Sequence, residues 1–364
     1  MSDSSSTSIL AQSNVLARLG RIGKAREIGV LAALFAVIAI TTIQNPNFLF
    51  SSDGFRDLLV TPAILMIVAV GQAVVIITRN VDLSVGSVVG LSAYLTGRVF
   101  IDFSWLPWPT VFLIGIAFGA LLGLINGCLV AFARVPSLVI TLGTLYAYRG
   151  INVMWTGSDR INASDMPADF LALGTKSWFS IPVITVIALV VLAIAGWYMY
   201  TQRGGREFYA IGSDPDAANL YGLQVKRRIL TAFVVSGALA GLAGVLYAAR
   251  YGTVNSQVGS GLELEAVGAA VIGGVAIFGG SGSVFGAAIG AYLLLTINRA
   301  LPVLGVEDFW QRAVVGVLII GAIVLDKVAA NRQERRLLDL RDTEHDTGGP
   351  PPPGDKEEKE AHRV

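Results

Sequence analysis

The chain has 364 residues, of which 54% are hydrophobic and 15% charged, with 27 basic and 26 acidic side chains. Soluble domains carry charges at about 25% of their positions, so a mean hydropathy of +0.64 excludes an ordinary soluble domain and predicts an integral membrane protein. The formal net charge of +1 gives no indication of a nucleic-acid partner.

The first 27 residues are polar, serine-rich at their start and basic toward their end, and we expect them to form a cytoplasmic tail. The apolar run that follows is too long for a cleaved signal peptide and lacks a small-residue cleavage site. An uncleaved first membrane span is therefore predicted from about Ile28 to Ile43.

Further apolar runs predict further spans. They are Leu58–Thr78, Leu83–Phe100, Thr110–Ala133, Pro136–Trp155, Ile181–Tyr200, Ile229–Ala249, Ala266–Asn298 and Phe309–Leu325. The run 266–298 exceeds one crossing of about 20 residues, and the glycine-rich stretch Gly279–Ser283 divides it, so we expect two short helices there. The predicted fold class is an all-α integral membrane protein with about ten transmembrane helices and both termini on one side.

The distribution of basic residues supports an even number of spans. With a cytoplasmic N-terminus, 19 of the 27 basic residues fall inside, as the positive-inside rule requires. The others lie outside or near the outer face: Arg56, Arg98, Arg149, Arg160, Lys176, Arg250, Arg299 and Arg312. A nine-span alternative would move the basic cluster Lys327–Arg341 outside. We expect a permease domain over 28–327 and, because residues 328–364 become charged and then proline-rich, a disordered cytoplasmic tail.

Two parts of the chain are faintly alike. The stretch Gly119–Gly127 matches Gly286–Arg299 loosely, aligning Asn126 with Asn298, and the two lie in spans of opposite direction. This match predicts an inverted repeat of spans two to five and seven to ten, with the transport pathway at the interface of the repeats. A competing match between Gly86 and Gly282 joins spans of the same direction, and short Gly-Ser strings recur by chance.

Acidic side chains stand at the starts of spans three and eight. Asp82 precedes one, and Glu263 and Glu265 begin the other. Carboxylates near membrane depth usually face a cavity or a partner, which makes these three candidates for a gate. Helix capping is the simpler interpretation of all three, since Ser84 lies near Asp82 and Ser260 and Glu263 have capping-box spacing, and capping does not exclude a gating role. Asn126, Thr141 and Asn298 are candidate pathway residues that could instead form hydrogen bonds between packed helices.

The polar segment, Thr201–Arg228, separates two apolar runs and carries five basic residues. A short helix is predicted within it, with Ser213 or Asp214 as N-cap, Pro215 at the first helical position, Asp216 near the positive helix end, and Gly222 as a left-handed stop. We therefore expect a capped surface helix of about two turns.

The stretch EFYAIGSDPDAANLYGLQV in the polar segment resembles the cytoplasmic loop of ABC-importer permeases of the ribose and branched-chain amino acid type. TRNVDLSVGSVVG and ELEAVGAAVIGGVAIFGGSGSVFGAAIG are also similar to that family and occur in matching order, so the resemblance extends over about Leu58–Asp326. Details such as the TRN before DLSVGS are closer to the rhamnose and autoinducer-sugar branch.

The resemblance implies a permease of the cell (plasma or inner) membrane that imports a monosaccharide, with rhamnose as the best guess. It also implies that the loop is a coupling helix that docks on separate ABC ATPase subunits. The coupling residues would be Ser213, Asp214, Pro215, Asp216, Ala217, Ala218, Asn219 and Gly222. The other implied partners are a sugar-binding protein, membrane lipid, and either a second copy of the permease or a homologous one.

Residues for catalysis are lacking. His345 and His362 both lie in the tail, Cys128 is the single cysteine, and no GxxxxGK[ST] phosphate loop occurs. We therefore expect no enzyme activity and no cofactor in this chain. The alternative is a secondary, ion-coupled sugar transporter, which would need buried ionisable groups in mid-span, whereas the charges here cluster at span ends. A channel or a membrane scaffold would not explain the coupling segment.

Overall fold

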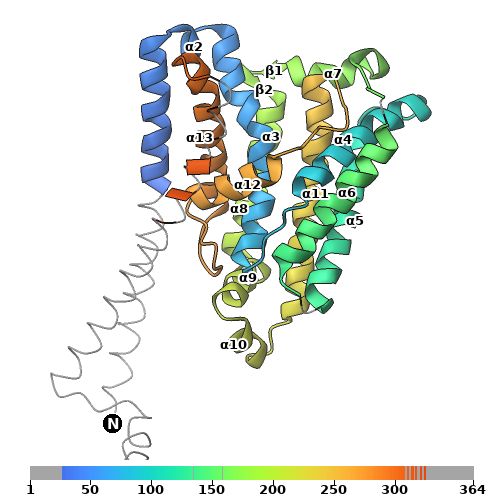
Figure 1. Ribbon diagram of the computed structural model, residues 1–364, viewed down its shortest axis with the longest axis vertical. Helices are drawn as coiled ribbons and strands as arrows, with labels where there is room; N and C mark the ends of the chain where they lie inside the picture. The colour runs from blue at the N-terminus through green and yellow to red at the C-terminus, as the bar shows by residue number, and fades with distance from the viewer. Residues whose placement is uncertain are drawn as a thin grey trace, which may run out of the picture. The chain divides into compact units, whose positions relative to one another are not determined.

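The computed structural model describes residues 27–307, apart from 134 and 158, together with isolated residues between 310 and 324. The chain divides into a unit that ends at Ile319, which holds every element named below, and a second unit that begins at Ile320. The first unit is a bundle of helices (Figure 1). Its elements are the helix Glu27–Gln44, α2 (Asn47–Phe50), α3 (Ser52–Ile77), α4 (Val85–Asp102), α5 (Thr110–Ala133), α6 (Ser137–Thr156), the 3-10 turn η1 (Ala163–Asp165), α7 (Ala168–Thr175), β1 (Ser177–Trp178), β2 (Ile181–Pro182), α8 (Val183–Thr201), α9 (Arg203–Ser213), α10 (Pro215–Leu220), α11 (Val225–Tyr251), α12 (Leu262–Ile272) and α13 (Val284–Val303).

The core of the bundle is α3. Every residue from Pro62 to Ile77 is buried, whichever side of the helix it occupies. A helix that is apolar all round belongs in the interior, and α3 is surrounded by α8, α11, α12 and α13. The sequence run that looked like an ordinary span is therefore the helix about which the others pack.

Glycines bring α5 and α11 into close contact. Gly115, Gly119 and Gly123 recur every fourth residue on α5 and face Gly237 and Gly241 on α11. A Cβ atom added at Gly119 would overlap the carbonyl oxygen of Gly237, and one added at Gly237 would overlap that of Gly119. Small residues at this spacing let helix backbones approach in lipid, where no hydrophobic driving force holds helices together.

Two helices, α4 and α12, begin partway along the length of the bundle. The start of α4 is buried, whereas Gly261 and Leu264 at the start of α12 are exposed. Residues 78–84 lead from α3 to α4, residues 252–261 lead from α11 to α12, and Figure 1 shows both connections passing between the other helices. With 11 residues, α12 is about 16 Å long, roughly half of a bilayer core of about 30 Å. The prediction of two helices in the run 266–298 is confirmed, but the first begins at Leu262 and the break is wider than predicted, extending over residues 273–283.

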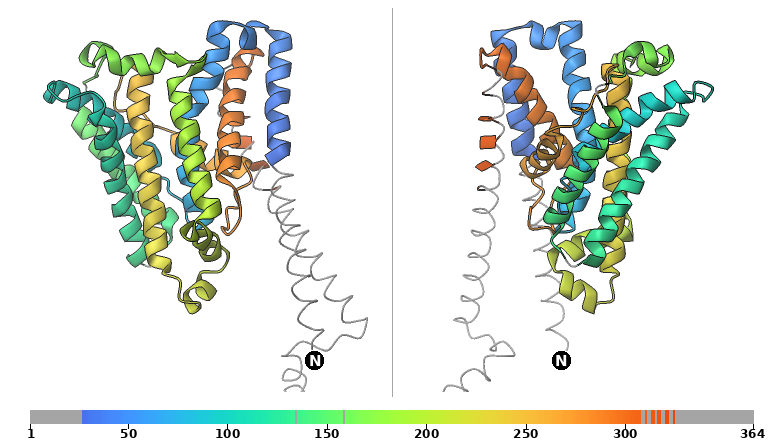
Figure 2. Two further views of the ribbon diagram at one scale, coloured as in Figure 1. Left: turned by 180° about the vertical axis from the view of Figure 1, so that it is seen from behind. Right: turned by 45° about the vertical axis from the view of Figure 1, so that its right-hand side comes forward.

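The two ends of the bundle differ. One end carries α2, α7 and the antiparallel pair β1–β2, and the other carries α9 and α10 (Figures 1 and 2). Basic residues at the first end are held by local partners: Arg56 donates to the carbonyl of Gly174 at 2.6 Å, and Arg250 pairs with Asp57 at 2.8 Å. The predicted helix thus lies at the opposite end of the bundle from Arg56 and Arg250, two of the predicted outer basic residues.

Six of the described helices have the length and composition to cross a membrane: Glu27–Gln44, α3, α5, α8, α11 and α13. Helices α4, α6 and α12 also coincide with predicted runs, although α12 is too short for a full crossing. The last predicted run, 309–325, lies largely outside the described residues, as do the tails 1–26 and 328–364. The described residues therefore form an all-α, multi-pass membrane protein.

Candidate functional site

The polar segment folds into two helices where one was predicted. Before the predicted helix lies α9, whose residues Phe208, Ile211 and Gly212 are buried while its opposite face is polar. Apolar residues three and four positions apart share one face of a helix, so α9 lies with that face against the bundle. The sequence predicts the cap of α10, but the amphipathic helix that precedes α10 in the chain was not predicted.

The cap of α10 forms as predicted, with Asp214 as the N-cap. The Asp214 carboxylate accepts hydrogen bonds from the backbone N–H groups of Asp216 and Ala217, both at 3.0 Å, and Pro215 opens the helix. At the other end Gly222 has φ +79°, and the N–H of Leu223 donates to the carbonyl of Ala218 at 3.0 Å. This is the left-handed stop of a helix C-terminus. Only Pro215–Leu220 are helical, because Ser213 ends α9 instead.

The exposed residues of α10 are not the alanines. Ala218 is only 5% exposed and Ala217 is half-buried, so Ala218, one of the expected coupling residues, has no open surface for docking. Leu220 and Tyr221 are each 87% exposed at the tip of the segment. Two large apolar side chains at this level of exposure form a small contact surface, which the sequence analysis did not single out.

The polar segment is joined to the core through α9. Gly212 packs against the carbonyl of Ile77 at the end of α3, and Gly280 donates its N–H to that same carbonyl at 3.0 Å. The Tyr209 hydroxyl donates to the carbonyl of Gly282 at 3.0 Å. A displacement of α9 would therefore act on the end of α3 and on the glycine turn between α12 and α13 together.

An ion-pair cluster stabilises the base of the segment. The Glu207 carboxylate accepts from Arg203 on its own helix at 2.9 Å and from Arg228 on α11 at 2.6 Å. Desolvation acts to raise the pKa of Glu207, but the hydrogen bonds and charges of Arg228 and then Arg203 outweigh it and hold that pKa below its ordinary value. Glu207 is thus ionised near neutral pH and ties α9 to the start of α11.

Three of the candidate pathway residues meet at the connection between α3 and α4. Asp82 accepts from the backbone N–H of Ser84 at 3.0 Å and from its hydroxyl at 2.7 Å, while Asn126 donates to the Ser84 hydroxyl at 2.6 Å. Thr141 donates to the carbonyl of Val81 at 3.1 Å. Asp82, Asn126 and Thr141 are all almost fully buried. They hold the start of α4 by hydrogen bonds within the protein, the packing alternative that the sequence left open.

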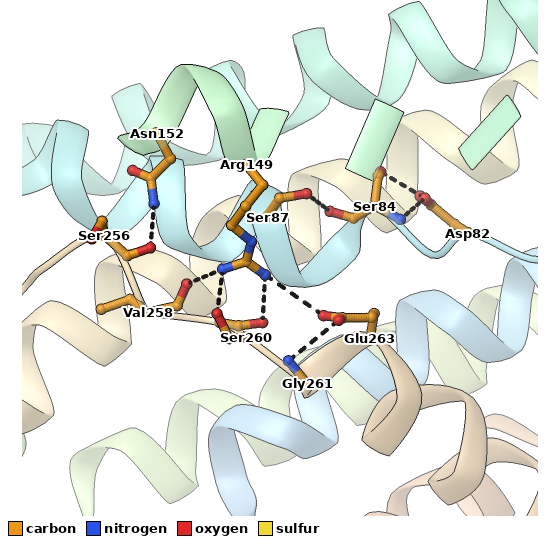
Figure 3. A network of polar contacts seen from close by, with 11 residues as sticks. Asp82, Ser84, Ser87, Arg149, Asn152, Ser256, Val258, Ser260, Gly261 and Glu263 are labelled. Carbon is orange, nitrogen blue, oxygen red and sulfur yellow. Dashed lines mark hydrogen bonds and ion pairs between the residues drawn. The ribbon is translucent and has the colours of Figure 1, made fainter. Parts of the chain in front are cut away.

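Arg149 forms a second network on the other side of α4 (Figure 3). Its guanidinium donates to the carbonyls of Val258 at 3.0 Å and Gly259 at 3.2 Å and to the hydroxyl of Ser260 at 2.8 Å. It also pairs with Glu263 at 3.8 Å, and both side chains are largely buried. We call these residues the Arg149 clasp, because they hold the α11–α12 connection against α6.

The clasp corrects two expectations. Arg149 was placed outside or near the outer face, among charges said to cluster at span ends, but it lies well inside α6 and pairs with Glu263 in the first turn of α12. Ser260 was the expected cap of the following helix, but the N-cap is Gly261, whose N–H donates to Glu263 at 3.3 Å. Ser260 instead accepts from Arg149. A lone arginine in an apolar run was the available sequence signal.

Glu265 and Asn298 stand apart from both networks. Among the described residues, no hydrogen bond or ion pair joins either of them to the other candidates, and the Oδ1 atom of Asn298 is buried without a hydrogen-bond partner. The described residues also hold no group of three or more His, Cys, Asp or Glu that could bind a metal ion. His345 and His362 lie outside the described residues. The described contacts hold the helices in position relative to one another.

Comparison with known proteins gives consistent matches along most of the chain. The family model described as branched-chain amino acid transport system / permease component matches residues 54–323. A protein of Enterobacter sp. (strain 638) named autoinducer 2 import system permease protein LsrC is 35% identical over 90% of this chain and 94% of its own length. Proteins of the same name from Klebsiella pneumoniae subsp. pneumoniae and Yersinia enterocolitica serotype O:8 are 35% and 36% identical over 86% and 83% of this chain and 91% and 82% of their own lengths. No solved structure matches the chain.

Proposed function

Because the chain belongs to the family of branched-chain amino acid transport system permease components, a family of transport subunits and not of enzymes, we propose that it forms the membrane pathway of an ATP-driven sugar importer. The single observation that carries this proposal is the polar segment, which combines an exposed apolar tip with a packed connection to the core. ATP would be hydrolysed on separate ATPase subunits that dock on this segment.

The docking contact is assigned to Leu220 and Tyr221, with the capped helix Asp214–Gly222 holding them in place. Binding energy at protein interfaces concentrates in a few large side chains such as tyrosine, which fits two residues at 87% exposure. Movement of the docked tip would pass through α9 to the end of α3 and to the glycine turn at Gly280–Gly282. Ala218 supports α10 from within and takes no direct part in docking.

The transported solute is proposed from the relatives. The similar proteins are named for the import of autoinducer 2, so this chain is assigned to the same class of small sugar-derived solutes. The relatives give no support for rhamnose. A binding protein would deliver the solute, and a second permease, either another copy of this chain or a homologous one, would complete the pathway.

The candidate gate is formed by the starts of α4 and α12, which lie partway along the length of the bundle. Asp82, Asn126 and Thr141 hold the start of α4, while Glu263, with Glu265 in the same turn, stands at the start of α12 beside the Arg149 clasp. Transport pathways are often lined by helices that begin within the membrane. At membrane depth, non-helical backbone is tolerated only where it is buried in protein or lines a cavity. Asn298 is a weaker candidate for the same pathway.

The finer topology remains part of the proposal: ten spans, an inverted repeat of spans two to five and seven to ten, and a permease domain over 28–327 between cytoplasmic tails 1–27 and 328–364. Its support is the helix found at every predicted run up to residue 298 and the separation of Arg56 and Arg250, two of the predicted outer basic residues, from the polar segment. The chain would then lie in the plasma or inner membrane with both termini in the cytoplasm.

The proposal is tested by placing charge on the exposed tip. The double variant Leu220→Glu/Tyr221→Glu should enter the membrane in normal amount, because both side chains are exposed and make little contact within the chain. A desolvated acidic side chain should prevent docking on the ATPase. Uptake of autoinducer 2 and ATPase activity stimulated by the binding protein, measured in proteoliposomes at equal permease content, should both fall at least tenfold.

The matched control is Phe179→Glu, which changes an equally exposed residue, 91% exposed, in the turn between β1 and β2 at the other end of the bundle. It should retain ATPase coupling. Uptake by the Leu220→Glu/Tyr221→Glu variant at the wild-type rate would reject the docking assignment. Uptake that follows an ion gradient without ATP would instead establish a secondary transporter.

A further inference from the structure

An apolar cavity of about 480 Å³ opens between α8 and α11, directly above α9. Its walls include Ile194, Ala195 and Trp197 from α8, Phe208 from α9, and Val235 and Leu239 from α11. The polar atoms at its edge are the hydroxyls of Tyr198 and Thr231, and the latter already donates to the carbonyl of Arg227 at 2.7 Å. A cavity with such walls suits a hydrocarbon chain and offers little to a polar solute.

Basic side chains lie near the edge of this cavity that adjoins α9. Arg206 donates to the carbonyl of Thr201 at 2.9 Å, which places its guanidinium at the end of α8, one turn beyond Trp197. Arg203 and Arg228 both pair with Glu207, and the Arg228 guanidinium lies beside Gly204 and close to the Tyr198 hydroxyl. Arg203, Arg206 and Arg228 therefore set three arginines against the single carboxylate of Glu207 near this edge. The Arg203 side chain is 84% exposed, so its remaining donors are open to a ligand.

The same edge has the features of a membrane interface. Trp197 and Tyr200, at the end of α8, are 58% and 72% exposed, and α9 buries one apolar face while turning its basic residues outward. Aromatic residues concentrate where the acyl chains of a bilayer meet the headgroups, and amphipathic helices lie in that plane. The arginines therefore lie at the level of the lipid headgroups, and the cavity lies next to them on the side of the acyl chains.

We propose that this cavity and its arginine rim form a binding site for one anionic phospholipid. An acyl chain occupies the space between α8 and α11, and the phosphate of the headgroup accepts hydrogen bonds from Arg203 and Arg206. Arginine is well suited to this contact, since its planar guanidinium matches phosphate oxygens. The lipid would fill the space between α8 and α11 and rest on α9, the helix that connects the polar segment to the core. The inference depends on the membrane location and is independent of the solute transported.

The test uses the full chain, purified in detergent, delipidated and titrated with phosphatidylglycerol or with phosphatidylcholine of the same acyl chains, with bound lipid counted by native mass spectrometry. The wild type should bind one phosphatidylglycerol at least tenfold more tightly than phosphatidylcholine. The variant Arg203→Gln/Arg206→Gln should lower phosphatidylglycerol affinity by roughly tenfold and leave phosphatidylcholine unchanged. Glu207 keeps its partner Arg228 in this variant, so the ion pair to α11 persists.

Two further variants separate the cavity from the rim. Ala195→Trp fills the cavity and should weaken both lipids; Val235→Phe does the same from α11 if the first variant fails to fold, which thermal unfolding in detergent will show. The matched control is Lys226→Gln at the start of α11, because Lys226 lies over the Phe132 ring of α5 and does not line the cavity. It should bind both lipids as the wild type does.

Equal affinity of the wild type for the two lipids would overturn the proposal, since the cavity would then hold bulk lipid without selection. A shift of oligomeric state by Ala195→Trp with phosphatidylglycerol binding intact would overturn it as well, by identifying the cavity as a contact between copies of the chain. Loss of uptake in the Leu220→Glu/Tyr221→Glu variant is a separate result and leaves lipid binding unaffected.

Discussion

At the scale of single residues, we expect Arg149 to have the largest effect on the stability of the protein. It is an arginine inside an apolar helix. Its donors are used by two carbonyls and a hydroxyl of the α11–α12 connection and by the Glu263 carboxylate in the first turn of α12. Within a membrane such a charge is costly unless its partners are complete. The connection it holds contains positive-φ glycines at 259 and 261 and forms no helix of its own, so Arg149 supplies the order that local structure does not.

We predict that Arg149→Leu destabilises the protein by about 3–5 kcal/mol, because it leaves the buried Glu263 carboxylate without its counter-charge. Thermal unfolding of the purified protein in detergent measures this change. The double variant Arg149→Leu/Glu263→Leu should recover part of the loss, since no unpaired charge then remains.

The control for this prediction is Arg98→Leu in α4. Arg98 pairs with Asp102 at 2.7 Å, but its side chain is 35% exposed, and exposed pairs contribute about 0–1 kcal/mol. Similar effects of Arg149→Leu and Arg98→Leu on the unfolding temperature would show that the clasp adds little to stability.

At the scale of elements, the contact between α5 and α11 depends on backbone approach. We predict that Gly119→Leu prevents accumulation of folded protein, because any side chain at this position overlaps Gly237 and Gly241. The comparison is Gly143→Leu in α6, where an added Cβ meets no atom within 4 Å. Membrane yield and size-exclusion profiles of the two variants measure the difference. Normal yield of Gly119→Leu would mean that the helices are further apart than described.

The glycine turn between α12 and α13 combines two demands. Gly280 has φ +74° and packs against Ser213 at the end of α9, whereas Gly305 has φ +80° with open space around it. We predict that Gly280→Val abolishes uptake, because a β-branched residue is both strained at this φ and too large for the contact with α9. Gly305→Val carries the strain alone and should retain most uptake. Equal uptake by the two variants would argue against a mechanical role for the turn.

At the scale of the whole molecule, the proposed orientation can be tested by labelling. In a Cys128→Ser background, single cysteines at Asn219 in α10 and at Gln333 should react with an impermeant maleimide only from the cytoplasmic side. A cysteine at Phe179 should react only from outside, since Phe179 stands in the turn between β1 and β2, which lie at the opposite end of the bundle from α10 (Figure 1). Reaction of the Gln333 position from outside would remove the ten-span arrangement.

The sequence by itself determined the long apolar helices and the two ends of α10. Uncharged runs become helices because backbone groups in lipid must be satisfied within one segment, and the predicted and observed bounds of α5 agree at both ends. Asp214, Pro215 and Gly222 define α10 through contacts a few residues apart, which a linear pattern records fully. The same holds for the positive φ of the glycine turn.

Only the tertiary structure decided which side chains meet and at what depth. Arg149 and Val258 are 109 residues apart along the chain, and the residues next to each of them do not indicate that the two are in contact. Ala218 is buried, although Ala217 before it is only half-buried and Asn219 after it is exposed. The position of α12 depends on the connection before it, which packs against Gly86 and Gly90 of α4 and is bonded to Arg149 of α6. Burial and long-range pairing are properties of the assembled bundle. The sequence indicates which side chains are candidates for such contacts, but it does not indicate which of them pair with one another.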